Sequence, residues 1–253
     1  MKINKIYNEN CLDTMARMPD CFVDLVITSP PYSNIRDYKG FEYNFEALAK
    51  ELWRIIKKGG VVVWVIGDKT VKGGEELVPF EQALYFKQIG FCVETMIYAK
   101  PNCPFPANVR YNQQFEFMFV FSKGKPSTFN PIQKERVRNK QEKVGFRQKN
   151  GEWIKKEVGL KKETKDASNV WEYGGWDKNL GHPAVFPLQL ATDHILTWTK
   201  ENDLVYDCFN GSGTTSEACI KNNRNWIGSE ISSEYCNIIE TRIKKAWEEK
   251  YSS

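Results

Sequence analysis

The sequence predicts an α/β fold in which helices cover both faces of a mostly parallel β-sheet. Short apolar runs rich in β-branched residues alternate along the chain with longer segments whose apolar residues recur at helical spacing. The strand candidates are apolar at successive positions, as expected of strands that are buried on both faces. A chain of 253 residues is long enough for one large domain or for one domain with a substantial insertion.

The strand candidates are bounded by glycine, proline or polar residues. In chain order they are Phe22–Thr28, Val61–Ile66, Phe91–Tyr98, Phe115–Phe121, Leu204–Cys208 and Trp226–Ser229. Helices are expected over Phe45–Lys57, Glu81–Gln88, Thr215–Asn222 and Glu234–Lys250. Gly59 and Gly60 are expected to end the first of these helices. This alternation of helices and buried strands is typical of a parallel sheet.

A basic stretch between Lys123 and Lys165 interrupts the alternation. It contains fourteen Lys or Arg against five Glu, in a chain whose net charge is only +4. Because it has few aliphatic residues and no sustained period, we interpret it as a loop-rich insertion. Two interpretations fit this composition: a solvated loop, or a surface that binds a polyanion. We therefore expect one domain formed by residues 1–122 and 171–253, with an insertion over residues 123–170.

The composition excludes several classes of protein. Seven cysteines without a Cys-x-x-Cys pair, and only two histidines, argue against a disulfide framework and a zinc site, so no metal is expected. The longest apolar runs are far shorter than the roughly 20 residues of a membrane helix. The first residues lack the apolar stretch of a signal peptide. We therefore expect a cytoplasmic protein with no membrane partner.

The segment Thr28–Tyr32, with the sequence T-S-P-P-Y, follows the first strand candidate. In open α/β sheets, ligands bind beyond the carboxyl ends of the strands. Two successive prolines remove two N–H donors, which leaves the neighbouring carbonyl groups to accept hydrogen bonds from a ligand. Ser29 adds a hydroxyl group and Tyr32 a flat ring, so the segment suits a planar group with an exocyclic amine. A rigid turn without a ligand is the alternative.

A second candidate site is the glycine-rich segment Asp207–Thr215, which follows a strand candidate and opens a helix. Gly211 and Gly213 permit a tight turn, and the helix N-terminus offers N–H groups to a carboxylate or phosphate. The segment lacks the third glycine of a dinucleotide fingerprint and the Gly-Lys-Ser/Thr of a P-loop. Glu230 ends the next strand candidate, where an acid can bond ribose hydroxyl groups.

With these motifs the sequence resembles the amino-methylating DNA methyltransferases that use S-adenosylmethionine. Ser29–Tyr32 matches their catalytic signature (S/D/N)-P-P-(Y/F), and Phe209–Gly213 matches their cofactor signature F-x-G-x-G. Gly181–Pro187 resembles their G-H-P-A-x-F-P element. The resemblance covers the chain except roughly Lys125–Asp166. Because the catalytic motif precedes the cofactor motif, the chain resembles the permuted, β-type members of this family.

The resemblance implies a Rossmann-like methyltransferase fold, S-adenosylmethionine as cofactor, and a target-recognition role for the insertion. The implied catalytic residues are Ser29, Pro30, Pro31 and Tyr32. The implied cofactor contacts are Asn10, Asp207, Phe209, Gly211, Gly213, Thr214, Glu230, His182 and Pro183. The implied DNA contacts are Arg136, Arg138, Lys140, Lys143 and Arg147.

Individual roles follow from the same resemblance. Asp207 would lie near the cofactor's ammonium group, and Glu230 would bond its ribose. The two glycines of the turn, Gly211 and Gly213, would let its methionine part approach the backbone. Asn10 departs from the family, which usually has Gly-Asp at this place, with the acid facing the adenine. An amide can still offer hydrogen bonds there.

The implied reaction is direct transfer of a methyl group to the exocyclic amine of a base flipped out of duplex DNA. Ser29 and the Pro30 carbonyl would accept hydrogen bonds from the amine, and Tyr32 would stack on the base. Serine at the first motif position favours cytosine N4 as the target, with adenine N6 as the alternative. A catalytically inactive DNA-binding relative is a third reading.

Double-stranded DNA is the expected partner. The sequence leaves open whether the protein has a cognate restriction endonuclease and whether it forms a homodimer. The implied setting is a restriction–modification system or an orphan enzyme of bacterial, archaeal or phage origin.

Overall fold

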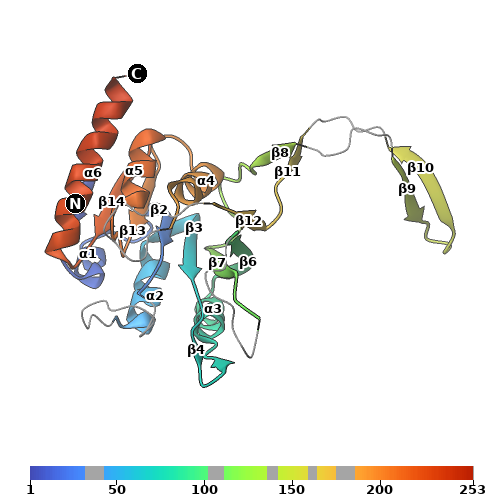
Figure 1. The fold of residues 1–253 in the computed structure, drawn as a ribbon, viewed down its shortest axis with the longest axis horizontal. Helices are drawn as coiled ribbons and strands as arrows, with labels where there is room; N and C mark the ends of the chain where they lie inside the picture. The colour runs from blue at the N-terminus through green and yellow to red at the C-terminus, as the bar shows by residue number, and fades with distance from the viewer. Residues whose placement is uncertain (32–42, 102–110, 136–141, 159–163, 175–185, 253) are drawn as a thin grey trace. The chain divides into compact units, whose positions relative to one another are not determined.

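The computed structural model describes residues 1–31, 43–101, 111–135, 142–158, 164–174 and 186–252, with the backbone alone at 142–146 and 155–158 (Figure 1). The chain divides into two compact units. The larger unit comprises Met1–Asn130 and Asn169–Ser253, and the smaller unit comprises Pro131–Ser168.

The larger unit combines helices with an eight-stranded sheet. The helices are α1 (Cys11–Ala16), α2 (Phe45–Ile55), α3 (Val78–Gln88), α4 (Leu188–Trp198), α5 (Thr214–Lys221) and α6 (Ser233–Tyr251). The strands of the main sheet are β1 (Lys5–Tyr7), β2 (Val23–Thr28), β3 (Ile56–Ile66), β6 (Cys92–Ala99), β7 (Phe115–Ser122), β12 (Val170–Glu172), β13 (Leu204–Asp207) and β14 (Asn225–Ser229). A short hairpin, β4 (Thr70–Val71) with β5 (Gly74–Glu75), precedes α3.

The strand order of the main sheet is β1-β14-β13-β2-β3-β7-β6-β12 (Figure 1). Its neighbours pair in parallel from β1 to β3, and β12 pairs in parallel with β6. Only β7 runs antiparallel to its neighbours, β3 and β6, within this sheet. The predicted α/β architecture with a mostly parallel sheet is confirmed.

Helices lie on both faces of the sheet. Helix α2 contacts α1 and α3 in one layer, whereas α5 contacts α4 and α6 in another. Strand β3 is buried on both faces of the sheet. Val62, Trp64 and Ile66 belong to the core that includes α1, α2 and α3. The alternating Val61, Val63 and Val65 are equally buried. Burial on both faces explains why the run Val61–Ile66 is apolar at every position.

The boundary between α2 and β3 differs from the expectation. Helix α2 ends at Ile55 and β3 begins at Ile56, so Gly59 and Gly60 lie inside the strand and do not end the helix. The extended backbone of Ile56 pairs with Val23 of β2, and the register then shifts before Leu25 pairs with Val61. Gly60 is needed at this irregularity because a Cβ atom there would lie 2.9 Å from the Asp24 carbonyl oxygen.

Several elements were missed by the sequence reasoning. Helix α4 has the helical spacing of apolar residues that could have revealed it, since Leu190, Ala191, His194 and Ile195 are all buried. Strand β1 and helix α1 are too short to show a clear period. Helix α3 begins at Val78 and not at Glu81, with Pro79 in its first turn.

The smaller unit contains two antiparallel strand pairs. Strand β8 (Gln133–Glu135) pairs with β11 (Thr164–Asp166), and β9 (Glu142–Arg147) pairs with β10 (Trp153–Val158). The stretch predicted as loop-rich therefore holds β structure that its composition does not reveal. The residues from Lys123 to Asn130, which were expected in the insertion, belong to the larger unit, because Lys123 and Ser127 bond to Gly59 and Asn130 bonds to Thr197.

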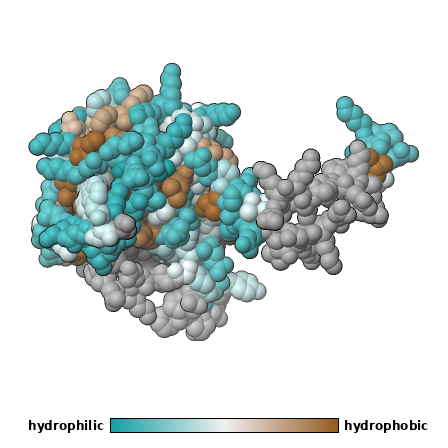
Figure 2. Space-filling model, turned by 90° about the horizontal axis from the view of Figure 1, so that it is seen from above, coloured by the Kyte–Doolittle hydropathy of each residue, from teal (hydrophilic) through white to brown (hydrophobic). Residues whose placement is uncertain are grey.

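One face of the protein is mainly polar. On the face seen in Figure 2, hydrophilic residues predominate and the apolar ones form separate spots. Such scattered apolar residues are ordinary for a protein surface. Within the part of the chain that the structure describes, the helices are too short or too polar to cross a bilayer.

Candidate functional site

The two predicted motifs meet at the point where the strand order reverses. From β2 the chain passes to β3 on one side, whereas from β13 it passes to β14 on the other. Strands β13 and β2 pair in parallel, so their carboxyl ends lie next to each other. Ligands of open α/β sheets bind at this kind of switch point. The S-P-P residues follow β2 and the glycine turn follows β13, so both motifs lie at the same edge of the sheet.

Asp207 joins these two segments. Its Oδ1 accepts a hydrogen bond from the Thr28 hydroxyl at 2.7 Å and from the Phe209 N–H at 3.1 Å. Its Oδ2 accepts one from the Thr215 hydroxyl at 2.6 Å. The side chain is 2 % exposed, and this burial raises its pKa to about 6, although the three hydrogen bonds favour the charged form. Asp207 therefore holds β2, the turn and α5 together, and its contact with a cofactor ammonium stays a prediction.

The glycine turn has the backbone that its sequence predicted. Gly211 and Gly213 have φ angles of +50° and +83°, in the left-handed region that favours glycine. Gly213 is the N-cap of α5, whose first N–H groups have no partner within the helix. A Cβ atom on Gly213 would lie 3.2 Å from Ile239 of α6. This glycine thus permits close packing against α6, a purpose that the sequence did not show.

Asn210 fixes the middle of the turn from inside the protein. Its side-chain amide donates to the Ser216 hydroxyl at 3.0 Å, and its backbone N–H bonds to the Ser229 carbonyl at 2.9 Å. A Cβ atom on Gly228 would lie 2.6 Å from the Asn210 amide nitrogen, so a larger residue there would have to displace the buried Asn210 side chain. The turn is therefore braced by α5 on one side and by β14 on the other.

Glu230 lies against the same turn. One carboxylate oxygen accepts a hydrogen bond from the Gly211 N–H and the other from the Ser232 N–H, each at 2.9 Å. Burial raises the pKa of this half-buried side chain, against the effect of those two bonds. Each oxygen keeps a lone pair for a further donor. The predicted neighbourhood of Glu230 and the glycine turn is present, and its bond to a ribose stays a prediction.

The side chain of Thr214 contacts helix α6. Its hydroxyl accepts a hydrogen bond from Arg242 at 3.0 Å, and the same guanidinium donates to the Ser212 hydroxyl at 3.1 Å. Arg242 also pairs with Glu217. No sequence motif marks this arginine, because it lies on a charged helix far along the chain. Arg242 anchors the start of α5. The Thr214 hydroxyl keeps its own proton for a further acceptor, and its contact with a cofactor stays a prediction.

Asn10 caps α1 at the same edge of the sheet. Its side-chain oxygen accepts a hydrogen bond from the Leu12 N–H at 2.9 Å. Strand β1 pairs in parallel with β14, and the Asn8 amide donates to the Glu230 carbonyl at 2.9 Å. Asn10 is therefore near the carboxyl end of β14, on an exposed surface.

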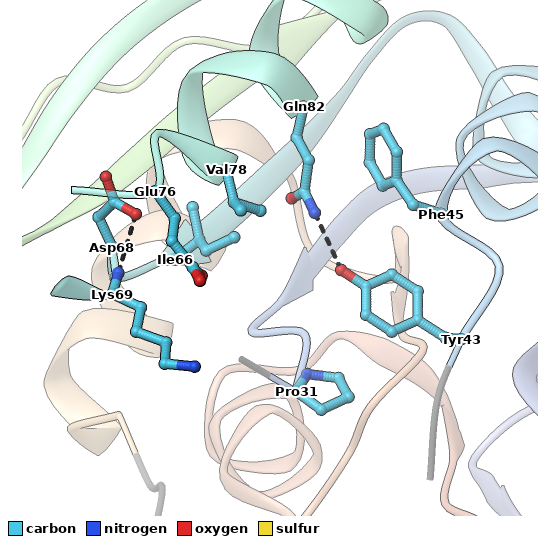
Figure 3. A pocket seen from close by; sticks show the side chains of 10 residues that line it. Pro31, Tyr43, Phe45, Ile66, Asp68, Lys69, Glu76, Val78 and Gln82 are labelled. Atoms are coloured by element: carbon cyan, nitrogen blue, oxygen red, sulfur yellow. Dashed lines mark hydrogen bonds between the residues drawn. The ribbon is translucent and has the colours of Figure 1, made fainter. Parts of the chain in front are cut away.

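A pocket of about 210 Å³ lies between the ends of β2 and β3 (Figure 3). It is lined by Pro31, Tyr43, Phe45, Ile66, Gly67, Asp68, Lys69, Glu76, Val78 and Gln82. The Tyr43 ring also meets the Phe209 ring edge to face, with centroids 5.2 Å apart. Tyr43 thus connects this pocket with the glycine turn, although it belongs to neither sequence motif.

The predicted catalytic, cofactor and DNA contacts are only partly within the described residues. Tyr32, His182, Pro183, Arg136, Arg138 and Lys140 lie outside the described residues. Lys143 is in β9, where only the backbone is described, and Arg147 is exposed and donates to the Gly151 carbonyl at 3.4 Å. Ser29 is half-buried and Pro30 is buried, directly after β2.

Comparison with known families decides what kind of protein has this site. The profile of the N6_N4_Mtase family, described as DNA methylase, matches residues 23–241. This chain belongs to that family. The DNA methylase is 48% identical to the orphan methyltransferase M.BamHII of Bacillus amyloliquefaciens, over 89% of this chain and 90% of that protein. It is 28% identical to the type II methyltransferase M.BglII of Bacillus subtilis, over 93% and 68% of the two chains.

Solved structures share the fold of this DNA methylase. PvuII DNA methyltransferase, which is cytosine-N4-specific, matches with a TM-score of 0.71 and 21% identity over 98% of this chain and 92% of that one. M1.HpyAVI in complex with SAM matches with a TM-score of 0.61 and 24% identity over 94% and 98% of the two chains. The Rossmann-like methyltransferase fold that the motifs implied is thereby confirmed.

Proposed function

We propose that this DNA methylase transfers a methyl group from S-adenosylmethionine to the exocyclic amine of a base in double-stranded DNA, with cytosine N4 as the favoured target. The hydrogen bond between Thr28 and Asp207 carries the proposal. It joins the S-P-P turn to the glycine turn at the switch point of the sheet, so a base and a methyl donor could lie side by side there. S-adenosylmethionine is the methyl donor of this family.

The residues around the glycine turn fit this cofactor. The first N–H groups of α5 suit a carboxylate, because a helix N-terminus carries partial positive charge. Phe209 is half-buried beside the turn and offers a ring face, and Glu230 retains acceptor capacity for ribose hydroxyl groups. Asn10 lies at the same edge, where it would face the adenine. When bound, the cofactor supplies an electrophilic methyl group on its sulfonium.

The chain's own residues would hold the base. The target must leave the duplex to reach a crevice in the protein, at an unstacking cost of a few kcal/mol. The Ser29 hydroxyl and the Pro30 carbonyl would accept hydrogen bonds from its amine and localise the nitrogen lone pair. Tyr32 would stack on the ring. Asp207 would act indirectly, because its bonds to Thr28 and Phe209 fix the distance between the two turns.

Two features favour cytosine N4 over adenine N6. Serine stands at the first position of the S-P-P-Y motif. PvuII methyltransferase, one of the structural relatives, is cytosine-N4-specific. Adenine N6 is the alternative within the same mechanism. A relative that binds DNA without catalysis is the second candidate, and it would bind the cofactor without turnover.

DNA recognition is assigned in this proposal to the smaller unit, Pro131–Ser168. Arg136, Arg138, Lys140, Lys143 and Arg147 would contact phosphate groups there, since lysine and arginine supply most of such contacts. The name of the 48% identical relative, an orphan methyltransferase, favours action without a cognate nuclease. The type II relatives keep a restriction–modification role as the alternative.

The test is single-turnover transfer of labelled methyl to duplex DNA, with digestion to identify N4-methylcytosine or N6-methyladenine. Tyr32→Ala should lower the rate by about 10- to 100-fold, because stacking contributes roughly 1–3 kcal/mol per base. Ser29→Ala should also lower the rate, with cofactor binding retained in both variants. Full activity of Tyr32→Ala would contradict the proposed site, whereas adenine as the labelled base would overturn only the cytosine preference.

A further inference from the structure

The pocket between β2 and β3 contains a chain of hydrogen bonds with a fixed direction. The Trp64 indole N–H donates to the Gln82 side-chain oxygen at 2.9 Å, and the Gln82 side-chain nitrogen donates to the Tyr43 hydroxyl oxygen at 3.1 Å. Gln82 and Tyr43 line the pocket, and Figure 3 shows the Gln82 amide pointing to the tyrosine hydroxyl. Trp64 is fully buried in β3 behind them.

The direction of this chain follows from its first member. An indole nitrogen can only donate a hydrogen bond, so the atom of Gln82 that faces Trp64 must be its oxygen. The amide nitrogen must then face Tyr43, and the tyrosine oxygen must accept. The hydroxyl proton of Tyr43 is consequently left to point away from Gln82. A core tryptophan thereby decides which hydrogen-bonding character the tyrosine presents.

The phenol keeps that proton under ordinary conditions. Burial raises the pKa of Tyr43 above its usual range, so the side chain stays neutral at physiological pH. The ring is held by its edge-to-face contact with Phe209, which lies in the glycine turn. The Asp68 carboxylate, which also lines the pocket, accepts from the Lys69 N–H at 2.8 Å and from the Leu77 N–H at 3.0 Å.

We propose that Tyr43 donates a hydrogen bond to the ring nitrogen beside the target amine, and that Trp64 and Gln82 position it for this contact. The proposal rests on the proposed function. Cytosine and adenine both carry an acceptor nitrogen next to their exocyclic amine, namely N3 and N1. Ser29 and Pro30 would accept from the amine while Tyr43 donates to its neighbour. Guanine and thymine carry an N–H at the corresponding ring position, which would face a second donor.

This arrangement gives the pocket selectivity that the S-P-P turn alone lacks. Acceptors at Ser29 and Pro30 detect only an amine, which guanine also has. A fixed donor beside them detects the amine together with the adjacent acceptor, as enzymes that flip bases read the Watson–Crick edge. Tyr43 is thus a recognition residue, and Gln82 is a positioning residue that acts through it.

The experiment combines two protein variants with a modified base. The methylated site is first mapped in DNA from a host that expresses the protein, and duplexes are made with the normal target base or with its deaza analogue, 3-deazacytosine or 1-deazaadenine. The analogue replaces the ring nitrogen by C–H. Single-turnover methyl transfer is measured at saturating cofactor for the wild type, Tyr43→Phe and Gln82→Glu.

The wild type should methylate the analogue about 3- to 10-fold more slowly than the normal base, the effect of one neutral hydrogen bond. Tyr43→Phe should be slowed to the same extent on the normal base and no further on the analogue. Gln82→Glu should be slowed as much as Tyr43→Phe, although it keeps the tyrosine hydroxyl. Its carboxylate would accept from Trp64 with one oxygen and from the Tyr43 hydroxyl with the other, so the Tyr43 proton would no longer be available to the base. Cofactor affinity should be unchanged in both variants.

Two variants serve as matched controls. Tyr85→Phe removes the hydroxyl of a half-buried tyrosine of α3 that contacts Glu46 and does not line the pocket. Gln88→Glu adds the same charge at an exposed position of the same helix. Both should match the wild type on both duplexes.

Other outcomes would overturn the proposal. Wild-type rates for Tyr43→Phe on the normal base would show that the hydroxyl does not contact the base. If Tyr43→Phe methylated the analogue more slowly than the wild type does, so that the two rate reductions multiplied, the hydroxyl and the ring nitrogen would act independently of each other. Full activity of Gln82→Glu would refute the role of Gln82. Failure of the wild type to methylate any DNA would instead contradict the proposed function, so the two failures are distinguishable.

Discussion

Asp207 provides the sharpest prediction about stability, because a carboxylate buried at the centre of the site should cost stability when it is charged. Its side chain is 2 % exposed, and burial raises its pKa from 3.8 to about 6. The folded state therefore holds the proton more tightly than the unfolded chain does. Where the folded state binds more protons, stability falls as the pH rises. The loss occurs between pH 3.8 and about 6, and it is complete at pH 7.

The Asp207→Asn variant should lack this loss. An amide cannot ionise, its oxygen can still accept from Thr28 and Phe209, and the Thr215 hydroxyl can rotate to accept from its nitrogen. A shift of roughly 2 pKa units corresponds to about 3 kcal/mol. At pH 7 the variant should therefore be more stable than the wild type by up to about 3 kcal/mol, and near pH 4 the two should be nearly equal.

The assay is urea unfolding of both proteins at half-unit steps from pH 4 to pH 8. The difference in unfolding free energy should grow between pH 4 and 6 and stay constant above, since groups such as Glu230 are present in both proteins and cancel. Asp207→Ala should be destabilised at every pH, because two buried hydroxyl groups and one N–H lose their acceptor. A difference that does not change with pH would refute the assignment of a raised pKa to Asp207.

Three further predictions concern the cofactor turn and the DNA surface. Glu230→Gln should weaken S-adenosylmethionine binding in calorimetry by about 10-fold, since a neutral amide bonds ribose hydroxyl groups less strongly than a carboxylate does; unchanged affinity would exclude the ribose contact. Gly213→Ala should lower the unfolding free energy by about 1–3 kcal/mol, because the new Cβ atom must adopt a φ of +83° and lie 3.2 Å from Ile239; wild-type stability in thermal unfolding would show that α6 yields there. Replacing basic residues of the insertion by Gln should reduce DNA affinity and flatten its dependence on salt, with cofactor binding retained; a salt slope equal to that of the wild type would place the DNA surface elsewhere. The residues for this last variant are Arg136, Arg138, Lys140, Lys143 and Arg147.

The sequence by itself determined the class of the fold, a mostly parallel sheet with helices, and the place of its two motifs. Runs such as Val61–Ile66 are apolar at every position because both faces are buried, and this pattern is local and readable. The turns at Ser29–Pro31 and Phe209–Gly213 were recognisable because proline and glycine restrict or free the backbone of their own residues. Features that depend on a few consecutive residues could thus be predicted without the fold.

The tertiary structure decided which distant groups meet. Thr28 and Asp207 are 179 positions apart, and only the pairing of β2 with β13 brings their side chains to 2.7 Å. The burial that raises the pKa of Asp207 likewise results from the packed layers and not from its neighbours in the chain. The same holds for Arg242, which reaches Thr214 from α6.

The pocket shows this limit most clearly. Tyr43, Trp64 and Gln82 lie on three separate segments, and each has an ordinary place in the sequence. Their hydrogen bonds form because β3 and α3 pack together beside the S-P-P turn. Hydrogen-bond direction depends on the partner of each group, and partners are set by packing. The sequence therefore determined what kind of site this protein has, and the tertiary structure decided which side chains shape it.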